Sequence, residues 1–193
     1  MSKTKCLKLK KKILGGLMLA IDPTSGSVNH VTRSPSKAGW ALFKEGGLID
    51  SGTIDIKSSD KKEERFRDLI ETLQQFDEDY DILALEDIPM VRGRGSFNIS
   101  QTLIQACGVY IAGLPGELVE MNSNTWQAVA KRLGGWDKSD EGDAIYIGLS
   151  CIAFAEGYDA KFSEKKKLEF LGELIDTYSG WNLPGLLECW EDA

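Results

Sequence analysis

Two acidic side chains stand at the ends of short apolar runs. Asp22 follows the run LMLAI, and Glu86 follows the run ILAL. Apolar runs of this length predict buried strands. In open α/β sheets, ligands bind beyond the carboxyl ends of the strands, so an acid placed there can reach a substrate. Asp22 and Glu86 are therefore candidates for a polar site.

A second pair of acids opens a later segment. Asp140 and Asp143 lie three residues apart in SDEGDAIYIG, and in a helix this spacing puts both on one face. If the first and fourth strands are neighbours, Asp22 and Glu86 converge, and a helix packed beside them adds Asp143. Each acid also has a simpler interpretation. An acid after a strand is commonly a turn residue, and Asp140 could be the helix N-cap.

Three or four carboxylates in one place predict a site for hard divalent cations. Their charges repel one another unless cations lie between them, and Mg²⁺ prefers oxygen ligands while keeping several waters. Two such ions roughly 4 Å apart serve in-line hydrolysis of phosphodiesters. Other chemistries have less support. His30 is the only histidine, and the four cysteines are far apart with no CxxC pair, which argues against zinc ribbons and redox dithiols.

The predicted elements place these acids around one sheet. Apolar and turn patterns predict strands over residues 14–21, 39–43, 48–56, 81–87 and 117–121. Helical periodicity and breaker residues predict helices over residues 59–76, 96–113, 123–133, 140–156 and 162–178. Three hairpin-linked antiparallel strands followed by alternating strands and helices indicate an α/β fold, with a mixed five-stranded sheet flanked by helices. The helix over 96–113 is apolar on nearly every face, so either the C-terminal helices or a second subunit must cover it.

The charge balance excludes some partners. With 30 Asp and Glu against 23 Lys and Arg, the net charge of the 193 residues is −7, which argues against a protein that coats nucleic acid or an anionic membrane through bulk charge. Six lysines and no acid lie within residues 1–12. We therefore expect a basic arm over 1–16, a catalytic domain over 17–157 and a helical extension over 158–193. The N-terminal apolar run is too short to span a bilayer, so we expect no membrane association and a cytoplasmic location.

The order of the acids resembles that of the RuvC-type Holliday junction resolvases, in the ribonuclease H-like superfamily. The segments that carry the resemblance are LAIDPTSG, AGWALF, DILALED and SDEGDAIYIGLSCIAFA, within roughly residues 17–156. The family's opening motif, an aspartate followed by proline and a small residue, matches Asp22-Pro23-Thr24. Its fourth-strand glutamate matches Glu86. Its closing acid pair, followed by alanine, matches Asp140 and Asp143-Ala144.

This resemblance implies a ribonuclease H-like fold and a crossover junction endodeoxyribonuclease, which cuts four-way DNA junctions by paired phosphodiester hydrolysis. It implies two Mg²⁺ ions per active site, with Mn²⁺ able to replace them. Their ligands would be Asp22, Glu86, Asp140 and Asp143. It also implies a homodimer acting on branched DNA, in the host cytoplasm if the chain is a viral or phage variant. The sequence departs from the family after Glu86, because no aromatic residue appears before Phe97 to serve as a wedge.

Basic residues near the acids are candidate DNA contacts, with ordinary surface charge as the alternative. They are Arg92, Arg94, Lys131, Arg132 and Lys138. Two other functions stay open. One is a related nuclease that cuts flaps or RNA/DNA hybrids, and the other is a non-catalytic junction-binding protein in which the acids are caps and turns. The last of these predicts no metal binding.

Overall fold

The structure, a computed structural model, describes residues 3–24, 36–56, 59, 61–87, 96–134 and 136–178. Side chains are described from residue 7 onwards and, in the helix that begins at Ser96, from residue 101. Three residues singled out in the sequence lie outside the described residues. They are His30, Arg92 and Arg94.

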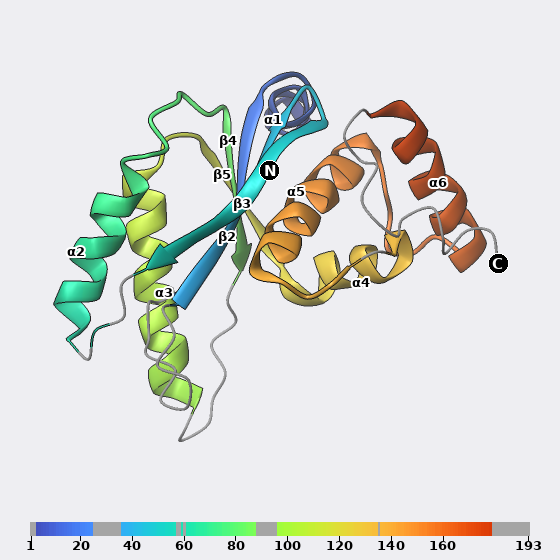
Figure 1. Ribbon diagram of the computed structural model, residues 1–193. Helices are drawn as coiled ribbons and strands as arrows, with labels where there is room; N and C mark the ends of the chain where they lie inside the picture. The colour runs from blue at the N-terminus through green and yellow to red at the C-terminus, as the bar shows by residue number, and fades with distance from the viewer. Residues whose placement is uncertain are drawn as a thin grey trace.

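One mixed sheet forms the centre of the fold (Figure 1). Its five strands are β1 (Leu17–Asp22), β2 (Ser36–Lys44), β3 (Gly47–Ile56), β4 (Ile82–Asp87) and β5 (Glu117–Asn122). They lie in the order β3-β2-β1-β4-β5. The first three strands pair antiparallel, β4 is parallel to β1, and β5 is parallel to β4. This confirms the predicted mixed five-stranded sheet, in which three antiparallel strands are followed by parallel ones.

Helices cover both faces of the sheet (Figure 1). Those described are α1 (Lys3–Gly15), α2 (Lys62–Leu73), α3 (Ser96–Gly113), α4 (Ser123–Leu133), α5 (Asp140–Glu156) and α6 (Glu164–Thr177). The helices α2 and α3 lie on one face. On the other face α5 packs against the strands, α4 packs against α5, and α6 packs against α4. Among the described helices, none has both the length and the apolar character needed to cross a bilayer.

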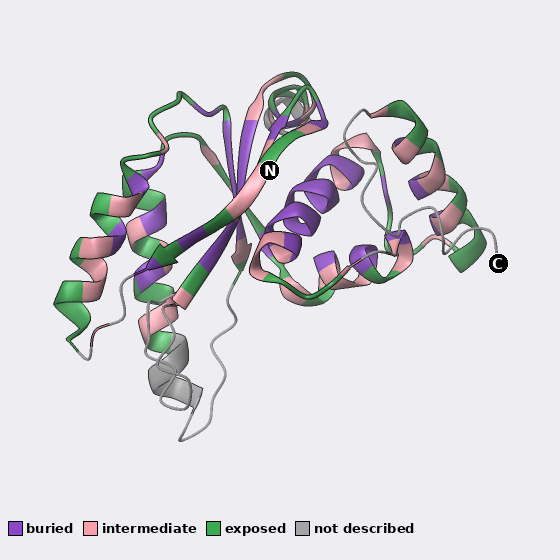
Figure 2. Cartoon of the chain, viewed as in Figure 1, coloured by how far each residue is buried: buried purple, intermediate pink, exposed green. Residues whose placement is uncertain are grey.

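Alternation of side chains along the strands divides the core into two layers. The layer that faces α4 and α5 contains Met18, Ala20, Ile82 and Ala84. The layer on the side of α2 and α3 contains Leu19, Ile21, Leu83 and Leu85. Because β1 and β4 are buried on both faces (Figure 2), nearly every position along them is apolar.

The helix α5 lies unusually close to the sheet. A Cβ atom at Gly148, in the middle of this helix, would lie 2.1 Å from the Phe43 ring of β2. Glycine at this position therefore lets the helix approach the strands without a clash. Gly142 and the run Ala144–Ala153 of α5 are buried. The sheet thus holds α5 along most of its length, which fixes where its first turn lies.

The predicted N-terminal arm is, over Lys3–Gly15, the helix α1. Ile13 is buried and Leu9 packs against the same core layer as α5. Two of the lysines are also paired, with Lys10 Nζ 3.3 Å from Glu156 Oε2 and Lys12 Nζ 3.2 Å from a carboxylate oxygen of Glu117. The many lysines concealed the helical spacing of Leu9 and Ile13. The domain boundaries at 157 and 158 stay predictions.

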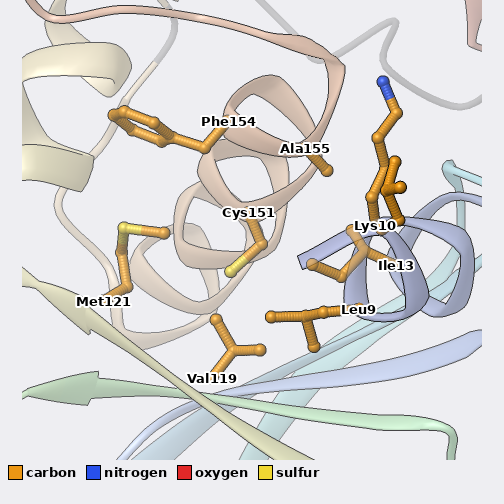
Figure 3. A pocket seen from close by; sticks show the side chains of 9 residues that line it. Leu9, Lys10, Ile13, Val119, Met121, Cys151, Phe154 and Ala155 are labelled. Atoms are coloured by element: carbon orange, nitrogen blue, oxygen red, sulfur yellow. The ribbon is translucent and has the colours of Figure 1, made fainter. Parts of the chain in front are cut away.

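An apolar pocket of about 250 Å³ lies between α1, α5 and β5 (Figure 3). Its lining includes Ile13, Val119, Met121, Cys151 and Phe154. The residues from α5 come from the last turns of that helix, whereas the candidate acids come from its first turn. The pocket and the acids therefore lie at opposite ends of α5, and the pocket is lined mainly by apolar side chains, with Lys10 as its charged member.

Candidate active site

Asp22 and Glu86 extend from neighbouring parallel strands toward the same face of the sheet. The register pairs Ile21 with Leu85, so the two acids form the next pair along β1 and β4. Both acids are in phase with the residues that face α5. Their carboxyl groups are close enough to share a proton in a hydrogen bond. The structure thus brings these two predicted site residues together.

The first turn of α5 lies against β2 beside this pair. Gly39 of β2 is the cross-strand partner of Asp22. A Cβ atom at Gly39 would lie 1.6 Å from the carbonyl oxygen of Asp140, so only glycine permits the contact. From this position, Asp140 and Asp143 lie near enough to Asp22 for their charges to raise its pKa. All four predicted acids therefore gather at the carboxyl ends of β1 and β4.

Ser139, and not Asp140, caps α5. Its Oγ accepts a hydrogen bond from the Gly142 N–H at 2.9 Å. The alternative in which Asp140 serves as the N-cap is therefore wrong by one residue. Asp143 is held from outside the helix, because its Oδ1 accepts a hydrogen bond from Trp136 Nε1 at 2.6 Å. Capping therefore does not account for either carboxylate.

The four carboxyl groups are costly to ionise where they lie. Burial raises the pKa of Asp22 well above its usual range, and the charges of Glu86, Asp143 and Asp140 raise it further. Burial also raises the pKa values of Glu86, Asp140 and Asp143. Acids that are buried together in this way favour either a shared proton or a bound cation.

The chemistry of these donors fits a divalent cation. Carboxylate oxygens are hard ligands of the kind that Mg²⁺ and Mn²⁺ prefer. In the part of the chain that the structure describes, no three Asp, Glu, His or Cys side chains are already spaced to hold a metal ion. Binding would require that the carboxyl groups be ionised and that they reorient toward the cation. The fit therefore lies in the type of donor and not in a preformed geometry.

Four further residues near the acids were not found from the sequence. Lys37 lies two residues before Gly39 on β2, so both are on the face of the strand that contacts α5. Its charge lowers the pKa of Asp140. The hydroxyl of Ser123 and the indole N–H of Trp126 lower the pKa of Glu86. Trp136 is the fourth. None of them belongs to a recognisable motif, and only the position of Ser123, directly after β5, pointed toward this edge of the sheet.

The predicted basic contacts have different surroundings. Arg132 is engaged by Glu164 of α6, with Nε 2.9 Å and the terminal NH₂ nitrogen 3.0 Å from its two carboxylate oxygens. This ion pair joins α4 to α6, which favours a structural role for Arg132. Lys131 is exposed. Lys138 is also exposed, and its Nζ lies 5.8 Å from the centroid of the Trp136 ring. Of these three, Lys138 is the one beside a residue that contacts a site acid.

The raised pKa of Asp22 predicts that Asp22→Asn stabilises the metal-free protein at neutral pH. Because the pKa is higher in the folded state, folding takes up a proton, and the stability of the wild type falls as pH rises from the unfolded toward the folded pKa. The amide carries no charge to bury. In thermal unfolding with EDTA, the melting temperature of the variant should be higher than that of the wild type at about pH 8. The difference between the two melting temperatures should be smaller at about pH 5. Each kcal/mol of stability corresponds to roughly 2–4 °C in melting temperature for a chain of this size. A variant that melts lower at both pH values would contradict this.

No protein-family model matches the chain, and no curated protein matches it. Solved structures of low sequence identity show similarity to this chain. One is T. thermophilus RuvC in complex with a Holliday junction substrate, at 16% identity and a TM-score of 0.48, covering 73% of this chain and 96% of that one. Another is a Thermus thermophilus RuvC structure, at 16% identity and a TM-score of 0.43, covering 69% of this chain and 92% of that one.

Proposed function

We propose that this chain is a metal-dependent endonuclease that resolves four-way DNA junctions by paired phosphodiester hydrolysis. The observation that carries the proposal is the gathering of Asp22, Glu86, Asp140 and Asp143 beside the first turn of α5. Clustered carboxylates are a means of holding cations for phosphodiester chemistry. A role as turn and cap residues does not explain why four acids share one partly buried place.

In this proposal the four acids hold two Mg²⁺ ions, which Mn²⁺ can replace. When bound, the ions supply an activated water and stabilise charge on the leaving oxygen. The chain supplies the positions. Asp22 and Glu86 extend from strands that are buried on both faces, so their backbone is rigid. The contact at Gly39 sets the first turn of α5, and the hydrogen bond from Trp136 orients Asp143.

Branched DNA is the proposed substrate, which places the activity in the cytoplasm, or in that of the host if the chain is viral. The test compares cleavage of labelled four-way junction, flap, RNA/DNA hybrid and linear duplex in Mg²⁺ and in EDTA. We expect paired cuts in the junction in Mg²⁺ alone. Preferential cleavage of the flap or hybrid would indicate another nuclease of the superfamily. Junction binding without cleavage of any substrate would support the non-catalytic alternative.

We also propose that the active form is a homodimer, with α3 in the interface. The described helices α4, α5 and α6 lie on the opposite face of the sheet, so they do not cover α3 (Figure 1). Ile104 and Ile111 of α3 are 36% and 41% exposed, and Leu118 of β5 is 36% exposed. A two-fold axis through this surface would bury these side chains on both copies. Sedimentation should then give twice the chain mass of 21.3 kDa.

Lys37→Ala should weaken junction binding by removing one phosphate contact. Lys37 is exposed beside the acids, and its partner Asp55 is 3.8 Å away, which leaves it available to DNA. We expect the affinity for the junction to fall several-fold. We also expect the slope of log affinity against log salt concentration to become less negative by about one. The matched control is Lys165→Ala on α6, which should change neither value. An unchanged salt slope in Lys37→Ala would contradict the proposed contact.

A further inference from the structure

Two tryptophans contact the acid cluster from different parts of the chain. The first is Trp136, in the segment between α4 and α5, whose Nε1 donates to Asp143 Oδ1 at 2.6 Å. The segment around it is held at both ends. The Tyr146 hydroxyl donates to the Gly134 carbonyl, and Ser139 caps α5. The indole therefore approaches Asp143 from a fixed position.

The second is Trp126 of α4, which is only 1% exposed. Its Nε1 is buried and has no hydrogen-bond partner of normal geometry among the described residues. A buried donor in this state is uncommon and calls for an explanation. The site acid that it approaches is Glu86 of β4. Trp126 thus lies next to a site acid without completing a bond to it.

The two rings also contact each other. Their centroids are 5.5 Å apart and the ring planes are inclined at 80°, which is the favoured edge-to-face arrangement. One indole N–H is directed to an acid on α5 and the other approaches an acid on β4. Displacing either ring would therefore disturb the carboxyl group beside the other.

We propose that Trp126 and Trp136 are coupled positioning residues that set the metal affinity of this site. The inference rests on the proposed function and deepens it. An N–H on one carboxylate oxygen fixes the plane of the group and leaves the second oxygen for a cation. Partners of this kind commonly change metal affinity by 10- to 100-fold. The Trp126 donor would be satisfied if Glu86 reoriented to hold a cation.

The test is a calorimetric Mn²⁺ titration of the metal-free full chain. Trp136→Phe keeps an aromatic ring beside Trp126 but lacks the N–H, so we expect its Kd for Mn²⁺ to rise about tenfold. Trp126→Phe should change the Kd in the same direction. The control is Trp40→Phe. Trp40 also makes an edge-to-face pair, with Phe76 at 5.6 Å and 72°, but it packs on the other core layer. Its Kd should stay within twofold of the wild type.

The outcomes separate the two proposals. If the wild type binds no Mn²⁺, the proposed function fails. If the wild type binds and both tryptophan variants bind as tightly as Trp40→Phe, the positioning role is overturned while the function stands. A merely structural role is tested by rescue, because excess Mn²⁺ should restore junction cleavage by Trp136→Phe to the wild-type rate. Failure of that rescue would also overturn the inference. So would the failure of both Trp126→Phe and Trp136→Phe to fold, because the two residues would then be structural.

Discussion

Asp22→Asn should cut a four-way junction at least about 10²- to 10³-fold more slowly than the wild type in Mg²⁺, while binding the junction with similar affinity. Asp22 is the acid whose pKa is raised by the charges of all three others, so it interacts with every other member of the cluster. The amide keeps the size of the side chain and can still donate to Glu86, but it lacks the charge that attracts a cation. Single-turnover cleavage and a gel-shift titration measure the two quantities.

The matched control for this prediction is Asp87→Asn. Asp87 follows Glu86 in β4, is exposed, and is in phase with Leu83 and Leu85 on the other face of the strand. The change in charge is the same, but the position is outside the cluster. We expect this variant to cut at the wild-type rate. Wild-type cleavage by Asp22→Asn would show that the carboxyl group at this position has no catalytic role.

Gly39→Ala should remove activity by a different route, through the placement of α5. The added Cβ would lie 1.6 Å from the Asp140 carbonyl oxygen, 2.2 Å from its carbonyl carbon and 2.8 Å from the Glu141 nitrogen. These are backbone atoms, so no side-chain rotation can relieve the clash. The first turn of α5 must move away from β2, which separates Asp140 and Asp143 from Asp22. We expect cleavage to fall at least about 10²-fold and stability to fall by about 1–3 kcal/mol or more.

The control for the glycine substitution is Gly15→Ala. Gly15 is the last residue of α1, is exposed, and would place its Cβ with nothing within 4 Å. Alanine is favoured over glycine in helices by up to about 1 kcal/mol, so this variant should be as stable as the wild type or slightly more so. Urea unfolding and junction cleavage are measured on both variants. Full activity and stability in Gly39→Ala would mean that this contact does not position the acids.

The sheet could be predicted from the sequence because its central strands are simple. The runs before Asp22 and Glu86 are apolar at every position, as expected for strands buried on both faces, and each ends in an acid. The glycines at 46 and 47 predict the hairpin, and the structure places its two-residue turn one position earlier, at Glu45-Gly46. These local signals, with the order of the elements, were enough to place the acids at one edge.

Other features depend on tertiary packing and could not be predicted. Leu9 and Ile13 have helical spacing, but α1 buries them only because α5 and β5 lie beside it. The choice of Ser139 over Asp140 as N-cap is a shift of one residue between two good capping residues. The approach of Trp126 to Trp136 joins a helix to a following segment, and no spacing in the sequence encodes it.

The central claim is that Asp22, Glu86, Asp140 and Asp143 act together as one metal site. Equilibrium dialysis of the metal-free chain against Mn²⁺, with bound metal counted per chain, tests it most directly. We predict saturable binding of at least one ion to the wild type and to Asp87→Asn, and none to Asp22→Asn. Equal binding by the wild type and Asp22→Asn, or no saturable binding by the wild type, would contradict the account.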